Sequence, residues 1–302
     1  MTSNNFSTSN RPAASASIPT AWAGCQVHCG ANDECNLVEG LDDAIYHGDT
    51  EALSCSMLKP LLTSPAHFRL ARQNLLGHST QAKDFGSLVH LLLLQPHLTA
   101  HAIAVYPGVA DGRDADYKAF AAQNANKLVV DEPTLQRAMG LVERLKARRY
   151  KGRALSAFLD ESLKEVSLYV REPVTGLRLR ARPDIYHPDF IFDLKTTRQS
   201  TLDGFCKDAV GFHYDMQAYM YLYVRAVFEG STVPKPFVFV AVESEEPHSI
   251  FTASAGGSFL ENGSAKFQRC LALYRSCSDQ DYWPDCSEDG ELEIEPWQQF
   301  NK

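Results

Sequence analysis

The chain has 302 residues, 44% of them hydrophobic, so it is long enough to bury one large core or two modest ones. Its longest apolar run, residues 88–94, is too short to cross a bilayer, and the N-terminus lacks the charged and then apolar plan of a signal peptide. These features exclude a secreted or membrane-spanning protein, and we expect a soluble, cytoplasmic one.

The negative charge is unevenly distributed along the chain. The net charge is −8, but residues 276–302 hold eight acidic residues against one lysine, which leaves only −1 for residues 1–275. A near-neutral body can still bind phosphates through a local basic lining, because the field inside a groove matters more than the summed charge. Nucleic acid is therefore not excluded as a partner.

The composition divides the chain into three parts. Its first residues are rich in Ser, Asn, Thr, Ala and Pro and have little to bury, so we expect residues 1–40 to be disordered. A folded domain is expected over residues 41–278, and an acidic tail over residues 279–302, with docking of DYW at 281–283 and EPWQQF at 295–300 as the alternative. The eight cysteines lack the CxxC pairs of zinc sites, so we expect reduced, unpaired thiols.

Helical patterns occupy the first part of the folded domain. Ser54 and Ser64 precede short helical stretches in the manner of N-cap residues. Residues 84–95 form an apolar helical pattern that is closed by a proline and contains His90. A lone histidine in such a run is usually a core side chain satisfied by one hydrogen bond, so a role as metal ligand needs further support.

The helical pattern over residues 136–150 ends in a basic cluster. Its members are Arg144, Lys146, Arg148, Arg149, Lys151 and Arg153, and the last four are the candidate DNA-binding residues. A run of this kind is usually a solvated helix face. The alternative is a rim that contacts DNA phosphates, which we favour because the body has little other clustered positive charge.

Three β-strands are predicted in the centre of the chain, over residues 165–171, 177–185 and 190–195. The second alternates apolar and polar side chains as a half-buried strand does, and β-favouring residues fill the third. The sequence His-Pro-Asp between them favours a turn. The last two strands are therefore expected to pair as a β-hairpin.

The predicted hairpin carries two aspartates and a lysine. Asp193 and Lys195 lie two residues apart on one strand and so project from one face, and Asp184 lies near them across the hairpin. Two carboxylates beside an ammonium group suit a hard divalent cation, and the lysine can steady an attacking water or the charge of the transition state. The alternative is a surface ion pair, but strands this apolar are usually buried, where unpaired carboxylates are costly.

The remaining candidate residues flank this hairpin. Glu165 begins the first predicted strand and is either a further metal ligand or an ordinary charge at a strand edge. After the hairpin, Gln217 and Tyr221 stand four apart in a helical pattern, so they share one face. A further buried strand is expected over residues 236–250, followed by a closing helix.

The order of these motifs resembles the PD-(D/E)xK nuclease core. Arg-Pro-Asp at 182–184 is followed nine residues later by Asp-Leu-Lys at 193–195. That pattern alone is a weak signal, but five ordered pieces are specific and resemble the RecE-type, exonuclease VIII-like branch. The five pieces are SPAHFR at 64–69, FGSLVHLLLLQP at 85–96, TGLRLRARPDIY at 175–186, DLKTT at 193–197 and YDMQAYMYLY at 214–223.

The resemblance implies an α/β fold with a restriction-endonuclease-like core, in which helices flank a central mixed sheet. It implies a site that binds Mg²⁺, for which Mn²⁺ can substitute. The implied metal ligands are His90, Asp184, Asp193, the backbone carbonyl of Leu194 and, if it is not an edge charge, Glu165. The implied catalytic residues are Asp184, Asp193, Lys195, Gln217 and Tyr221.

The activity implied by the resemblance is exonucleolytic hydrolysis of linear double-stranded DNA in the 5′→3′ direction, within phage-type recombination. A ring-shaped homo-oligomer, a trimer or tetramer, and a single-strand annealing protein as partner are implied as well. Two alternatives stay open: a Cas4-like or restriction-type nuclease with the same core, and a DNA-binding protein that keeps the fold without turnover. The cysteine spacing disfavours a Cas4-like iron–sulfur centre, and the intact Asp, Asp and Lys disfavour the non-catalytic alternative.

Overall fold

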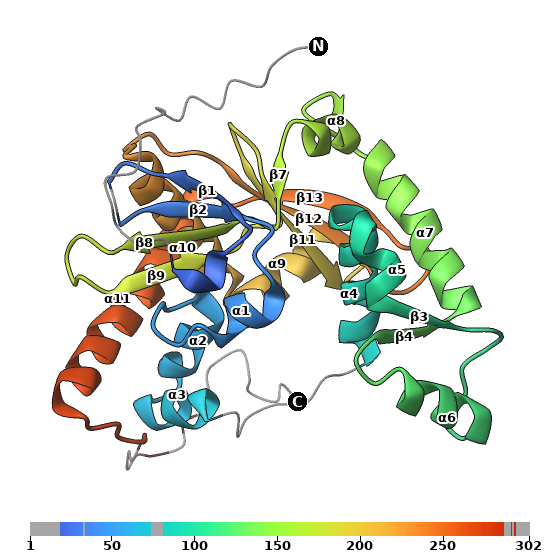
Figure 1. Cartoon of the computed structure of the whole chain (residues 1–302). Helices are drawn as coiled ribbons and strands as arrows, with labels where there is room; N and C mark the ends of the chain where they lie inside the picture. The colour runs from blue at the N-terminus through green and yellow to red at the C-terminus, as the bar shows by residue number, and fades with distance from the viewer. Residues whose placement is uncertain (1–18, 33, 74–80, 287–290, 292, 294–302) are drawn as a thin grey trace.

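The structure is a computed structural model that describes residues 19–32, 34–73, 81–286, 291 and 293. Two β-sheets form the centre of the fold, and helices pack around them (Figure 1). This arrangement confirms the expected α/β fold with a mixed central sheet. Among the described residues, no helix is both long and apolar enough to cross a bilayer.

The larger sheet carries the predicted hairpin. Its five strands run in the order β13-β12-β11-β10-β7. Strands β11 and β12 are parallel, and the other neighbouring pairs are antiparallel, so the sheet is mixed. The strand bounds are Leu163–Lys164 for β7, Ile185–Tyr186 for β10, Ile191–Thr197 for β11, Phe237–Glu243 for β12 and Ile250–Ser254 for β13.

Strand β11 is central because both of its faces are covered. Phe192 and Leu194 pack into a core built with helices α4 (Gln81–Leu94) and α7 (Glu132–Ala147). Ile191 faces the opposite core, which includes residues from α9 and α10. Strands covered on both faces read as continuous apolar runs, as β11 and β12 do. Figure 1 shows α4 and α7 together beside this sheet.

The smaller sheet is antiparallel, in the order β1-β2-β8-β9. Its bounds are Gln26–Cys29 for β1, Asn36–Glu39 for β2, Ser167–Arg171 for β8 and Arg178–Ala181 for β9. The predicted disorder of residues 1–40 is therefore wrong for the strand residues, since Leu37 and Val38 are buried and Trp22 packs 4.8 Å from Tyr169 between ring centroids. Residues 1–18 lie outside the described residues.

The helices and minor strands complete the fold around the two sheets. The remaining α-helices are α1 (Asp43–Gly48), α2 (Cys55–Leu58), α3 (Pro65–Arg72), α5 (Thr99–Ala102), α6 (Ala115–Gln123), α8 (Leu155–Asp160), α9 (Leu202–Gly211), α10 (Tyr214–Glu229) and α11 (Gly257–Gln280). Two short ladders join β3 (Ile103–Tyr106) to β4 (Leu128–Asp131) and β5 (Arg149–Tyr150) to β6 (Arg153–Ala154). The predicted N-caps are confirmed, because Ser54 accepts from Met57 N and Ser64 from His67 N.

Two of the predicted strands differ in the structure. The first, predicted over residues 165–171, begins only at Ser167 as β8, after a break at residues 165–166 that separates it from β7, and the second is broken between β9 and β10 by residues 182–184. These breaks put Glu165 and Asp184 in connecting segments, where the Glu165 amide donates to the Asp184 carbonyl at 3.1 Å. The interruptions therefore bring two carboxylates together that continuous strands would have kept in the ladder.

The predicted tail boundary at residue 279 is also wrong. Helix α11 runs to Gln280, and the residues after it return to the N-terminal helices. Trp283 stacks on Phe68 with ring centroids 5.1 Å apart, and Ala66 N donates to Pro284 O at 2.9 Å. Most of the acidic residues beyond 286 lie outside the described residues.

Candidate active site

The β10–β11 hairpin brings the two predicted aspartates together. Ile185 pairs with Phe192 across it, which confirms the predicted hairpin. The backbone amide of Leu194 donates to Asp184 Oδ2 at 2.6 Å. Asp184 is 9% exposed and Asp193 is 0% exposed. The hairpin thus holds both carboxylates at one end, in a buried setting.

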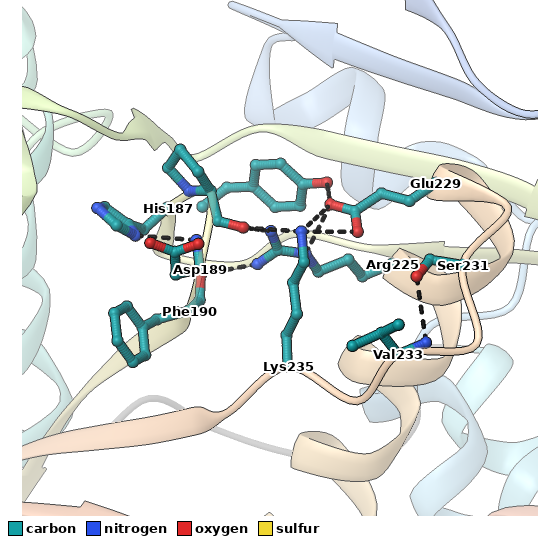
Figure 2. Close-up of polar contacts among 10 residues, drawn as sticks. His187, Asp189, Phe190, Arg225, Glu229, Ser231, Val233 and Lys235 are labelled. Atoms are coloured by element: carbon teal, nitrogen blue, oxygen red, sulfur yellow. Dashed lines mark hydrogen bonds and ion pairs between the residues drawn. The ribbon is translucent and has the colours of Figure 1, made fainter. Parts of the chain in front are cut away.

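A buried arginine fixes the turn of this hairpin (Figure 2). Arg225 of α10 is 2% exposed and donates to the carbonyls of Phe190 and Pro188 at 2.8 and 2.6 Å. Glu229, one helical turn further on, accepts from Arg225 Nε at 2.8 Å and from the Tyr186 hydroxyl at 2.7 Å. Because the buried charge is paired and hydrogen-bonded, the cluster avoids the cost of an isolated ion and ties the hairpin to α10.

Helix α4 brings His90 to the carboxylates. A Cβ at Gly86 would lie 2.5 Å from Thr196 Oγ1, so the absence of a side chain there lets the helix approach β11 closely. One turn later, His90 Nε2 lies 3.2 Å from Asp184 Oδ2 and 3.3 Å from Glu165 Oε1. Burial opposes protonation of the imidazole, but the adjacent carboxylates prevail and raise the pKa of His90 to about 9.

Glu165 completes a cluster with His90 and Asp184, in which the ligand atoms all lie within 4.8 Å of one another. Its backbone has a φ of 53°, a conformation that residues other than glycine seldom adopt. Burial, together with the charge of Asp184, raises the pKa of Glu165 to about 8. The buried Oε1 makes no hydrogen bond with the described residues, although His90 Nε2 is near. An orphaned buried oxygen of this kind is suited to a cation.

Asp193 and Lys195 form the second half of the site. Lys195 Nζ lies 2.5 Å from Asp193 Oδ2, and Gln217 of α10 donates to Asp193 Oδ1 at 3.0 Å. Burial raises the pKa of Asp193 to about 6 despite the charge of Lys195. Burial alone would lower the pKa of Lys195, but the charges of Asp193 and Asp184 raise it above its ordinary value. The lysine therefore keeps its charge in the buried site.

A cavity of about 330 Å³ opens beside the cluster. His90, Glu165, Gln217 and Tyr221 all line it, so the two residues predicted to share a helix face do reach the same space as the cluster. The Leu194 side chain packs into the apolar core, and its amide, rather than its carbonyl, contacts Asp184. The role of that carbonyl as a ligand stays a prediction.

The residues of the cluster fit a divalent cation. Two carboxylates and an imidazole form a mixed oxygen and nitrogen donor set, which suits Mg²⁺ through the carboxylates and Mn²⁺ through all three groups. Glu165, left open by the sequence, lies inside this cluster with His90 and Asp184. Asp193 is instead paired with Lys195 and Gln217, so its role as a ligand stays a prediction.

The predicted DNA-binding residues lie at the end of α7 and on the β5–β6 hairpin. Arg149 Nη1 donates to a carbonyl within that hairpin at 2.6 Å, and Arg153 pairs with Glu161 at 2.5 Å. Arg148 and Lys151 form no ion pair with the described residues. These two are the more available for phosphates, and the contact with DNA stays a prediction.

Three neighbours of the site were not predicted from the sequence: Lys59, Arg182 and Tyr214. Lys59 and Arg182 line the cavity. The Tyr214 ring centroid lies 4.8 Å from Lys195 Nζ and 5.5 Å from Lys59 Nζ. A signal existed for Tyr214, because it stands three residues before Gln217 and so shares its helix face. Lys59 has no comparable local signal.

Comparison with known proteins shows the family of the chain and a likeness in fold. Residues 54–296 match the family described as a PDDEXK-like domain of unknown function (DUF3799). A crystal structure from Eubacterium rectale, described as "Putative exonuclease", is similar with a TM-score of 0.53 and 13% identity over 82% of this chain and 92% of that chain. The crystal structure of SSO0001 has a TM-score of 0.26, which is too low to support an argument, and 12% identity over 70% of this chain and 84% of that chain. A search of the curated proteins found no match. Because the family match spans most of its length, the chain belongs to the family of PDDEXK-like domains of unknown function.

Proposed function

We propose that the protein is a Mg²⁺-dependent exodeoxyribonuclease that hydrolyses phosphodiester bonds of linear double-stranded DNA. One observation carries the proposal: the β10–β11 hairpin holds Asp184 near the Asp193–Lys195 pair, and Asp184 forms a cluster there with His90 of α4 and Glu165. Membership of the PDDEXK-like family supports a nuclease. The description of the Eubacterium rectale neighbour as an exonuclease points to the same reaction class.

Each side of the site has a separate task in this reaction. His90, Glu165 and Asp184 would hold the divalent cation, which when bound polarises a phosphoryl oxygen and lowers the pKa of a water molecule. Lys195, kept charged by Asp193, orients the attacking water and offsets the negative charge that develops on the phosphoryl group. Gln217 fixes the orientation of Asp193 through its hydrogen bond.

The finer details of the proposal are supported by the resemblance to the RecE-type branch. It favours 5′→3′ digestion, a role in phage-type recombination in the cytoplasm, and joint action with a single-strand annealing protein. It also favours a ring-shaped homo-oligomer, a trimer or tetramer. Arg148 and Lys151 would then supply contacts to backbone phosphates.

The test is hydrolysis of two substrates of equal sequence, one a linear duplex and the other a covalently closed circle, with Mg²⁺ and with EDTA. The proposal expects nucleotides to be released from the linear DNA alone, and only with Mg²⁺. Cleavage of the circle would indicate a restriction-type endonuclease. Binding without hydrolysis of either substrate would indicate a non-catalytic DNA-binding protein.

A further inference from the structure

A second hollow lies at the end of β11, just beyond Lys195. It has a volume of about 530 Å³, within the range of sites that hold small molecules. Its lining comes from the end of β11, from α9 and from the start of α10, and includes Thr196, Thr197, Arg198, Asp208, Phe212 and Tyr214. None of these residues belongs to the cluster that would hold the cation.

One aromatic ring connects this hollow to the active site. The centroid of the Tyr214 ring lies 4.8 Å from Lys195 Nζ, and Tyr214 also lines the hollow. The Phe212 ring lies 5.7 Å from the Tyr214 ring, tilted by 38°. A group bound against these rings would therefore lie next to the lysine that acts on the scissile phosphate.

The backbone holds Phe212 in a fixed and exposed position. Its amide donates to the carbonyl of Asp208 at 2.8 Å, and its carbonyl accepts from Lys59 Nζ at 2.9 Å. His213 then adopts a φ of 56°, where the chain turns from α9 into α10. The Phe212 side chain is 59% exposed. Single exposed apolar side chains are common, but this one shares a hollow with a second ring and so forms an aromatic platform.

Arg198 supplies positive charge at the same hollow. It is exposed and forms no ion pair or hydrogen bond with the described residues. Asp208, the acidic residue of the lining, is already engaged by Gln199 Nε2 at 2.8 Å. A guanidinium without a partner matches a phosphate, and aromatic faces beside positive charge are the combination that binds unpaired nucleotides.

We propose that this hollow binds the nucleobase of the nucleotide next to the scissile phosphate, with Phe212 and Tyr214 stacking on the base and Arg198 contacting its phosphate. The inference rests on the proposed function and names a part of its substrate. Every base has a π face, so such binding is independent of sequence, as exonucleolytic digestion requires. Because a base must leave its pair to enter, the hollow favours the frayed end of a duplex over its interior.

The test places a single abasic nucleotide at successive positions from the digested end of a linear duplex. We expect digestion by the wild-type protein to slow about tenfold when the abasic nucleotide reaches the hollow. The Phe212→Ala protein should digest intact DNA about tenfold more slowly than the wild type, and the abasic nucleotide should not slow it further. Phe212→Tyr keeps a ring and should behave like wild type. Phe212→Leu keeps the apolar character without the ring and should behave like Phe212→Ala. Val174→Ala, at a residue 89% exposed in the turn between β8 and β9 and outside the lining of the hollow, is the matched control and should change nothing.

A binding measurement separates this inference from the proposed function. In the Asp193→Asn protein, which the proposed function expects to be inactive, 2-aminopurine at the end of a duplex should lose fluorescence on binding, and Phe212→Ala added to that protein should restore it. Hydrolysis without a Phe212-dependent quench would overturn the inference and leave the proposed function standing. A Phe212-dependent quench without hydrolysis by the wild type would overturn the proposed function and leave the binding of a base in the hollow standing. A change in oligomer mass on Phe212→Ala, measured by light scattering, would show that the ring meets another subunit and would also overturn the inference.

Discussion

The backbone amide of Leu194 donates to the carboxylate of Asp184 at 2.6 Å, and this bond joins the two halves of the site. Leu194 stands between Asp193 and Lys195, whose side chains point away from its own. Asp184 in turn lies 3.2 Å from His90. The backbone of the hairpin therefore sets the distance between Lys195 and the cluster that would hold the cation.

Lys195→Ala should lower the rate of hydrolysis by at least a hundredfold, about 2.7 kcal/mol or more of transition-state stabilisation, while KM changes little. The reason is that the ammonium group acts on charge that develops only in the transition state. Steady-state kinetics on linear duplex DNA check this. Lys118→Ala, an exposed lysine without an ion pair among the described residues, is the matched control. Equal rates for both variants would remove Lys195 from catalysis.

His90→Ala should change the response to metal more than the stability of the fold. The imidazole is partly exposed and contacts two carboxylates, so its loss removes a ligand rather than core packing. Activity should fall at low Mg²⁺ and recover in part at raised Mn²⁺. Thermal melts and metal titrations of the same variant check this, and a large drop in melting temperature with an unchanged metal response would make His90 a packing residue.

Stability and metal affinity should depend on pH in opposite ways. Without metal, the pKa of Glu165 lies near 8 and that of His90 near 9, and both are above the ordinary pKa of the group. Their contribution to the stability of the fold is therefore fully present below the ordinary pKa values, and it is lost as pH rises through 8 for Glu165 and through 9 for His90. The metal-free protein should therefore melt at lower temperature at pH 9.5 than at pH 7. Both groups must lose protons to bind a cation, so Mg²⁺ affinity should rise over the same interval.

Glu165→Gln tests the cause of this pH dependence. The amide cannot titrate, so the variant should lose part of the fall in melting temperature between pH 7 and pH 9.5. It should also bind Mg²⁺ more weakly at every pH. Melts in EDTA and in excess Mg²⁺ measure both effects, and a pH profile identical to that of the wild type would assign the titration to other groups.

Two truncations should separate the acidic charge from the packed C-terminal segment. Deleting residues 287–302 removes five acidic residues and should raise affinity for DNA, with an effect that shrinks as salt screens exposed charges. Deleting residues 279–302 also removes Trp283, which packs on Phe68 and Tyr274, and should lower the free energy of unfolding by about 2 kcal/mol.

Trp283→Ala in the full chain is the control for that comparison. It should reproduce the loss of stability without the gain in DNA affinity, because it leaves every acidic residue in place. Chemical unfolding and binding of the inactive protein at two salt concentrations measure the two effects. If the shorter truncation were as destabilising as the longer one, the acidic segment itself would carry structural contacts.

The strands around the site could be predicted from the sequence, since the apolar runs of β11 and β12 and the turn at 187–189 are local signals. The contacts that complete the site are not local. The position of the Glu165 side chain depends on the left-handed backbone conformation of Glu165 itself, between β7 and β8. The position of His90 depends on Gly86, which lets α4 approach β11. Such features follow from tertiary packing, which residue spacing does not encode.

The folded N-terminal strands were missed for a related reason. Residues 26–39 contain few apolar side chains, and their propensity gave no indication of a sheet edge. Pairing of β2 with β8 provides the missing stabilisation, because Leu37 and Val38 pair with Leu168 and Ser167, which lie more than a hundred residues away in the sequence. Local composition underestimates order where a short segment completes an existing sheet.

The most direct test of the account is the rate of nucleotide release from linear duplex DNA by the wild type and Asp193→Asn, with saturating Mg²⁺ and with binding measured in parallel. Asparagine keeps the shape of the side chain and its contact with Gln217 but removes the charge opposite Lys195. The account predicts Mg²⁺-dependent release by the wild type, at least a hundredfold loss in the variant, and DNA affinity within a few-fold of wild type. Release by Asp193→Asn at more than about a tenth of the wild-type rate would contradict it.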